Sequence, residues 1–412
     1  MSRPRPVRFG PVRFGLTGAV LAGAVLAGVI SANAAWAEDG LTFDLSTRLF
    51  HDSNPGLLPQ GSPSETKGAL NLSFALNQET DVSKLALQGS LGLLDTENAP
   101  ASDPALTLTY DRLGANADVH VDAALQQSDV TSTSDIANFE TGQGQRRVAD
   151  LNAALNVNTS RPLGFGLRAG VSDISYHDNP SPDLIDSRTL DLGTTLRADL
   201  STVLHAELGL SVSRFTQDGQ PDRDTTGYSA GLVLDRPTGP LALQLTVEDT
   251  PDGQRERLGF DQQSDAPVFG GQLAYGLGVT HGVSGKTYLD GALHYDRDLA
   301  QGTLRLDLTR DITAGAETDS ETVQSRASLG VSQDVTATGS LALAVDWAEQ
   351  RDTLTGQTDA NTTLSATWSQ ELTADWALDL GYSHLVRDQD TVGRGQSDQV
   401  SLALRRSFSL RF

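Results

Sequence analysis

Apolar and polar residues alternate one by one along almost the whole chain, in stretches of about ten residues. Residues 204–213 read Leu-His-Ala-Glu-Leu-Gly-Leu-Ser-Val-Ser, and the stretches 41–49 and 85–93 show the same alternation. A period of two places successive side chains on opposite faces of a β-strand. The chain is therefore predicted to be all-β.

The same reasoning predicts about twenty strands, of which 254–262 has the weakest alternation. No amphipathic helix of useful length lies between them. The predicted strands are residues 41–51, 66–76, 83–94, 105–113, 116–127, 147–157, 163–176, 188–199, 202–215, 225–235, 239–249, 254–262, 270–280, 286–296, 302–312, 322–333, 339–349, 361–371, 374–387 and 398–412.

The connections between these strands alternate between short and long. Residues 114–115 and 200–201 are short turns, whereas 52–65, 129–145 and 388–397 are long and rich in Asp, Ser, Gly, Pro and Asn. Short turns at one end and polar loops at the other are typical of an up-and-down barrel whose two ends face different environments.

Strand length and face composition favour a barrel that spans a membrane. A tilted strand needs about 9–11 residues to cross the hydrocarbon layer, whereas strands of soluble proteins average about five or six. One face carries Leu, Val, Ala and aromatic residues, and the other carries Asp, Arg, Ser, Gln, Asn and Gly. So few bulky residues could not fill the interior of a soluble barrel of this size. We predict a transmembrane up-and-down antiparallel β-barrel of about 16–20 strands, with apolar residues facing lipid and a wet lumen.

The first residues predict export. Four arginines precede the uncharged run 14–30, and small residues ending in Ala35-Trp36-Ala37 follow it. This order is typical of a secretory signal peptide, here residues 1–37 with cleavage after Ala37, and residues 38–412 would form the single barrel domain. The alternative, a membrane anchor, is disfavoured because the run is shorter than the roughly 20 residues a helical span needs.

The last strand carries apolar residues at alternate positions and ends on an aromatic residue. The set is Val400, Leu402, Leu404, Arg406, Phe408, Leu410 and Phe412. It resembles the terminal strand of Gram-negative outer-membrane β-barrels. That resemblance implies an outer-membrane location, contact with outer-membrane lipid, and recognition of Phe408, Leu410 and Phe412 as an assembly signal by the barrel-assembly machinery. Arg406 departs from the pattern, and we expect it either to snorkel near one end or to be displaced by a bulge.

A second resemblance lies just after the first strand. Asp52-Ser53-Asn54 is similar to a turn of barrels that accompany exopolysaccharide export. An Asx-type turn that simply stops the strand explains the same residues without any function.

Composition excludes several other classes of protein. The formal net charge of −23 disfavours nucleic-acid binding, and the lack of cysteine rules out disulfides, thiolate metal sites and cysteine nucleophiles. The stretch 227–231 matches the G-x-S-x-G of hydrolases, but it runs into a strand pattern instead of a strand-to-helix turn. We predict no enzyme activity, no catalytic residue, no cofactor and no metal site.

The polar face defines the candidate lumen. It carries more carboxylates than cations, which favours cations within a pore, although cross-strand pairing could equally account for the charges. Lys84 belongs to the same set. The lumen-lining candidates are Asp44, Arg48, Asp118, Asp122, Asp150, Asp191, Arg197, Glu207, Asp290, Arg305, Asp307, Asp346 and Asp379.

Three functions remain open at this point. The first is a passive, weakly cation-preferring pore or the barrel component of an export system. The second is a plugged structural or adhesive surface barrel. The third is a hydrolase at the barrel rim, which would need a Ser or Asp beside one of the seven histidines. The oligomeric state is not predicted.

Overall fold

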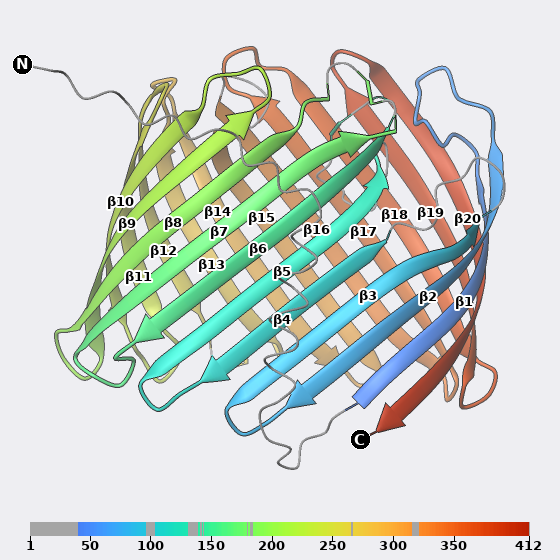
Figure 1. Cartoon of the computed structure of the whole chain (residues 1–412), viewed down its shortest axis with the longest axis horizontal. Coiled ribbons are helices and arrows are strands. Elements are labelled where there is room, and N and C mark those ends of the chain that lie inside the picture. The colour runs from blue at the N-terminus through green and yellow to red at the C-terminus, as the bar shows by residue number, and fades with distance from the viewer. Residues whose placement is uncertain are drawn as a thin grey trace, which may run out of the picture. The chain divides into compact units, whose positions relative to one another are not determined.

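The computed structural model describes residues 40–95, 104–130, 139–140, 142, 144–178, 180–181, 184–264, 267–314 and 321–411. The predicted signal peptide and Phe412 lie outside these residues. Twenty strands form one sheet, as Figure 1 shows. They are β1 (Gly40–Asp52), β2 (Glu65–Glu79), β3 (Ser83–Asp95), β4 (Ala105–Leu113), β5 (Ala117–Asp129), β6 (Gln145–Val157), β7 (Leu163–His177), β8 (Ser187–Asp199), β9 (Leu204–Gln217), β10 (Arg223–Leu234), β11 (Leu241–Thr250), β12 (Gly253–Gln263), β13 (Gln272–His281), β14 (Thr287–Leu299), β15 (Gly302–Ala314), β16 (Glu321–Thr336), β17 (Gly339–Asp352), β18 (Thr358–Glu371), β19 (Trp376–Gln389) and β20 (Gly393–Arg411).

Each strand pairs antiparallel with the next along the chain, and β1 pairs with β20 to close the barrel. The predicted all-β, up-and-down antiparallel barrel is confirmed, at the upper limit of the predicted strand number. Even the strand with the weakest alternation is present, as β12. Within the described ranges, no helix has the length and hydrophobicity required to cross a membrane.

The two ends of the barrel differ. We call the end that holds the connections β1–β2, β3–β4 and so on the loop end, and the end where β1 begins and β20 finishes the turn end (Figure 1). Two connections depart from the prediction. The predicted long loop 388–397 is a turn at residues 390–392, because its polar residues extend β20. The β12–β13 connection, residues 264–271, is long although it lies at the turn end.

The pairing register keeps apolar residues on one face and polar residues on the other from strand to strand around the whole barrel. Phe43 of β1 lies opposite Phe74 of β2 and Phe408 of β20, so the three rings share a face. Large apolar residues of this face are exposed in nearly every strand, as at Leu192 and Leu289. A barrel that exposes its apolar side chains outward needs an apolar environment around it.

The opposite face points inward. Arg255 of β12 donates from Nη1 to the Ile312 carbonyl of β15 at 3.2 Å, although β12 and β15 are not neighbours in the sheet. Such a contact is possible only on the concave side. We call this side the inner face, and the side of Phe43 the outer face.

Arg406 stays on the outer face. Its pairings with Leu45 and Trp376 show no register shift. There is thus no bulge at this position, and this alternative of the prediction is wrong. Trp376 is the first residue of β19, which places Arg406 near the turn end. The guanidinium lies 5.4 Å from the Trp376 ring and 4.7 Å from the Phe408 ring. Two cation–π contacts therefore accommodate the charge among apolar neighbours.

Asp52, Ser53 and Asn54 bind β20 at the loop end of the β1–β20 seam. Asp52 Oδ1 accepts from the Asn54 amide at 2.9 Å, which is an Asx turn, and also from the Ser397 hydroxyl. Asp52 Oδ2 accepts from Gln399 Nε2 at 2.6 Å, and the Ser53 hydroxyl accepts from the Asp398 amide at 2.8 Å.

The Asn54 side chain holds the loop that follows. Its Nδ2 donates to the Leu58 and Gln396 carbonyls at 3.0 and 2.9 Å, and its Oδ1 accepts from the Ser62 amide at 2.8 Å. Asp52 and Asn54 are each only 5% exposed. The three residues thus form an Asx turn, as the simpler interpretation expected, and they also connect loop 53–64 to the closing strand.

Replacing Asn54 by Ala is expected to loosen the seam. Buried carbonyl and amide groups left without partners cost about 1–3 kcal/mol each. The temperature at which the folded, fast-migrating band converts to the unfolded band on gels should fall for Asn54→Ala. Asn77→Ala, in β2 at the turn end, is the control and should behave as wild type. Equal midpoints for the two variants would contradict the role of Asn54.

Candidate functional site

The register places the lumen-lining candidates on one side of the sheet. Asp44 lies opposite Ser73 and Ser407, Asp150 opposite Ser172, and these positions share the inner face with Arg255. Following the alternation from strand to strand puts all the candidates there: Asp44, Arg48, Asp118, Asp122, Asp150, Asp191, Arg197, Glu207, Asp290, Arg305, Asp307, Asp346 and Asp379, with Lys84.

Many of these groups have local partners. Asp122 accepts from Thr109 at 3.0 Å and contacts His120. Asp346 accepts from Ser328 at 2.7 Å. Lys84 pairs with Glu79 at 2.7 Å. Cross-strand pairing, the simpler explanation of the charges, therefore applies to part of the set.

Sequence reasoning missed several inward cations. The register adds Arg168, Arg255, Arg257, Arg326, Arg387 and Arg405 to the inner face. It also adds acids such as Asp111 and Asp311, so carboxylates still outnumber cations on the described inner face. Strict counting by alternate positions would have found Arg255 and Arg257. The pattern was hidden because β12 carries the polar residues Gln254 and Glu256 on its outer face as well.

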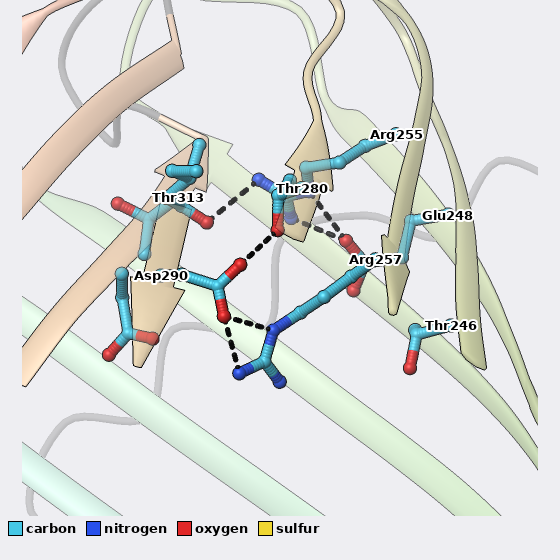
Figure 2. A pocket seen from close by; sticks show the side chains of 9 residues that line it. Thr246, Glu248, Arg255, Arg257, Thr280, Asp290 and Thr313 are labelled. Carbon is cyan, nitrogen blue, oxygen red and sulfur yellow. Dashed lines mark hydrogen bonds and ion pairs between the residues drawn. The ribbon is translucent and has the colours of Figure 1, made fainter. Parts of the chain in front are cut away.

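A hollow in the inner face lies on β11 to β15, toward the loop end. We call it the β11–β15 pocket. Its volume is about 230 Å³, and Figure 2 shows its charged and hydroxyl side chains converging from neighbouring strands. The lining residues are Thr246, Glu248, Arg255, Arg257, Thr280, Asp290, Asp311, Ile312 and Thr313.

Asp290 anchors one side of the pocket. Its side chain is 1% exposed, and Oδ1 accepts from Arg257 Nε at 2.8 Å and Nη2 at 2.7 Å. Oδ2 accepts from the Thr280 hydroxyl at 2.6 Å. A Cβ on Gly278 would collide with this carboxylate, so glycine makes room for it. The buried acid thereby fixes the orientation of the Arg257 guanidinium (Figure 2).

Arg255 is held on the other side of the pocket. Its Nε and Nη2 donate to Glu248 Oε2 at 2.7 and 2.5 Å, and Nη1 donates to the Ile312 carbonyl. All three nitrogens are engaged, so this guanidinium is rigid. A buried or half-buried arginine needs such a complete set of acceptors.

A second inner contact joins the β5–β6 connection to the wall at β18 and β19. Gln389 Nε2 donates to the Phe139 carbonyl at 3.2 Å, and Arg387 Nη1 donates to the Glu140 carbonyl at 3.2 Å. Arg387 is buried and also donates from Nε to Asn361 Oδ1 at 3.1 Å. Residues 139 and 140 therefore lie against the inner wall near the loop end.

The described residues hold no cluster of His, Asp and Glu that could bind a metal ion. Ser229 of the G-x-S-x-G match lies inside β10, opposite Gly209 and Thr246, with strand on both sides. A nucleophile elbow needs a turn into a helix, so this match has no structural support.

No protein-family model and no curated protein matches the chain. Among solved structures, it is similar to the ferric-catecholate import receptor Fiu of E. coli K12, with a TM-score of 0.51, 8% identity, and coverage of 90% of this chain and 81% of that chain. It is also aligned with OpdK of Pseudomonas aeruginosa (TM-score 0.38, 12% identity, 90% and 99% covered). The anion-selective porin of Comamonas acidovorans aligns similarly (TM-score 0.35, 13% identity, 90% and 100% covered).

The similarity to Fiu concerns the fold. Together with the closed antiparallel sheet, it shows that the chain has the β-barrel fold of Gram-negative outer-membrane proteins. It is an outer-membrane-type β-barrel, in agreement with the family resemblance of its last strand.

Removing the Arg257 side chain is expected to destabilise the barrel strongly. Arg257→Gln leaves the Asp290 carboxylate buried without its cation, at a cost of about 3–5 kcal/mol. The double variant Arg257→Gln/Asp290→Asn should recover most of this loss. Equilibrium unfolding in urea measures both.

The control for this prediction is Arg305→Gln. Arg305 pairs with Asp296 at 3.4 Å, and its side chain is 64% exposed, so its loss should cost about 0–1 kcal/mol. Similar losses for Arg257→Gln and Arg305→Gln would show that burial of Asp290 has no energetic consequence.

Proposed function

We propose that the protein is an outer-membrane channel through which small polar solutes diffuse passively, with a weak preference for cations. The observation that supports this most directly is the division between the two faces of one closed sheet, apolar outside and charged inside. A wall of this kind separates lipid from water.

The location rests on the outer face and the two chain ends. Exposed leucines along the outer face require lipid, and the predicted signal peptide and terminal aromatic strand fit export and insertion by the barrel-assembly machinery. The proposed partners are therefore outer-membrane lipid and that machinery. Both termini of the barrel would lie on the periplasmic side, and the loop end would face outward.

The cation preference rests on the excess of carboxylates on the inner face. A cation in the lumen has a lower energy beside them, and an anion has a higher one. Salt screens this interaction over about 8 Å at physiological ionic strength. The inward arginines and the local ion pairs reduce the excess, so the preference should be modest.

The export role has less support than the passive channel. Asp52, Ser53 and Asn54 have a structural explanation in the β1–β20 seam, so the resemblance of this turn to export barrels is the remaining argument for it. A plugged structural barrel is the competing class. The contact of residues 139 and 140 with β19 narrows the interior on one side, which is compatible with either class.

The lipid-facing assignment can be tested on one strand, β9. Leu210 lies on the outer face, 45% exposed, and Ser213 lies on the inner face opposite Asp191. Leu210→Arg should cost about 2–4 kcal/mol of unfolding free energy in lipid vesicles, whereas Ser213→Arg should cost little. The reverse order would mean that the register is shifted by one residue.

Reconstitution in planar bilayers tests the channel itself. We expect discrete open-channel steps and a reversal potential across a salt gradient that favours the cation, with the preference weakening as salt rises. Asp150→Asn together with Asp191→Asn should reduce it. Asp173→Asn, on the outer face opposite Arg188, is the control and should leave the cation preference unchanged. Absence of current would favour the plugged structural barrel, and anion selectivity would overturn the assignment of the carboxylates to the lumen.

A further inference from the structure

The β11–β15 pocket combines rigid donors with acceptors of opposite charge. We infer that it is a binding subsite for a neutral, hydroxyl-rich solute of about monosaccharide size. This inference rests on the proposed channel function and names a class of solute that the channel would carry.

The pocket leaves particular groups available to a ligand. Arg257 is 40% exposed, and its Nη1 takes no part in the pair with Asp290. Glu248 uses Oε2 for Arg255, which leaves Oε1 at the pocket surface. Asp311 is exposed, and the Thr246 hydroxyl can both donate and accept. Figure 2 shows Thr246, Glu248 and Arg257 on the same side of the pocket.

The mixture of charges selects against ions of either sign. An anion that approaches Arg257 also approaches Glu248 and Asp311, and a cation that approaches those carboxylates also meets the two guanidinium groups. A hydroxyl group donates to a carboxylate and accepts from a guanidinium equally well. A neutral polyol can therefore satisfy all of these groups without an uncompensated charge.

The groups are also preorganised. Asp290, which itself accepts from the Thr280 hydroxyl, holds Arg257, and Glu248 and the Ile312 carbonyl hold Arg255. Binding therefore does not have to order these long side chains. Gly259 and Gly278 face each other across β12 and β13 on the inner face. The lack of side chains at these two positions makes room for the Asp290 carboxylate, which would collide with a Cβ on Gly278, and for the Arg257 guanidinium, which lies over Gly259.

The volume of the pocket and the weak binding expected of it suit a solute that passes through the channel. A volume of about 230 Å³ corresponds to roughly eight water molecules at about 30 Å³ each. No aromatic ring is among the lining residues, so hydrogen bonds alone would hold the ligand. Weak binding of this kind allows release, which conduction requires.

The experiment compares three related sugars in planar bilayers. Glucose is neutral, glucosamine is cationic and gluconate is anionic. We expect glucose to reduce the channel current in a saturable way, and the other two to act more weakly. Thr246→Val and Asp311→Asn should each raise the apparent Kd for glucose about tenfold, the effect of losing about 1.4 kcal/mol of hydrogen bonding to a charged or polar group.

Thr225→Val is the matched control, because Thr225 lies on the inner face of β10 outside the pocket. Its Kd should equal that of wild type. A conducting channel that glucose does not block, or that gluconate, glucosamine or a zwitterion such as glycine blocks more strongly, overturns the subsite and leaves the channel function standing.

A second measurement is independent of conduction. Saturation-transfer NMR on the folded barrel in detergent micelles should detect bound glucose in wild type and in Thr225→Val, and lose the signal in Thr246→Val/Asp311→Asn. If no current is seen, this signal still decides the subsite: its loss in the double variant supports the subsite, and its absence in wild type overturns it.

Discussion

The hydrogen-bonded pairing of β1 with β20 is the constraint on which the rest of the structure depends. Closure removes both sheet edges, so backbone amides and carbonyls have partners within the sheet all the way around the wall. It also requires that the alternation of side chains agree after a full turn around the barrel. Once Phe43 is outward, every strand has only one consistent assignment of its two faces.

Polar and charged side chains with defined partners lie at both ends of the β1–β20 seam. Asp52, Ser53 and Asn54 satisfy backbone groups of β20 and of loop 53–64 at the loop end, where the ladder stops. At the turn end, Arg406 is compensated by the rings of Trp376 and Phe408. Polar groups therefore mark both ends of the seam, and each has partners that offset its cost in an apolar environment.

The inner face shows that similar charged pairs can differ greatly in energetic consequence. The Arg257–Asp290 pair includes a carboxylate that is almost completely buried, whereas Arg305–Asp296 is open to solvent. The first orders a pocket, and the second only keeps the wall polar. The β11–β15 pocket and the contact between residues 139–140 and β19 both lie toward the loop end. If the protein is the channel proposed above, solutes would meet both features in the half of the barrel at the loop end.

The amino-acid sequence by itself determined the strands, their two faces and the class of fold, because a period of two is a local property that each segment carries alone. It was sufficient to place Asp44, Glu207 and Asp379 on one face. Arg255 and Arg257 occupy alternate positions of β12, but polar residues on both faces of this strand hid the pattern. Tertiary structure alone decided the closure at twenty strands, the pairing of Asp290 with Arg257, and the contact of Glu140 with Arg387. These depend on the register between strands and on contacts between residues far apart in the chain, which only the closed barrel brings together.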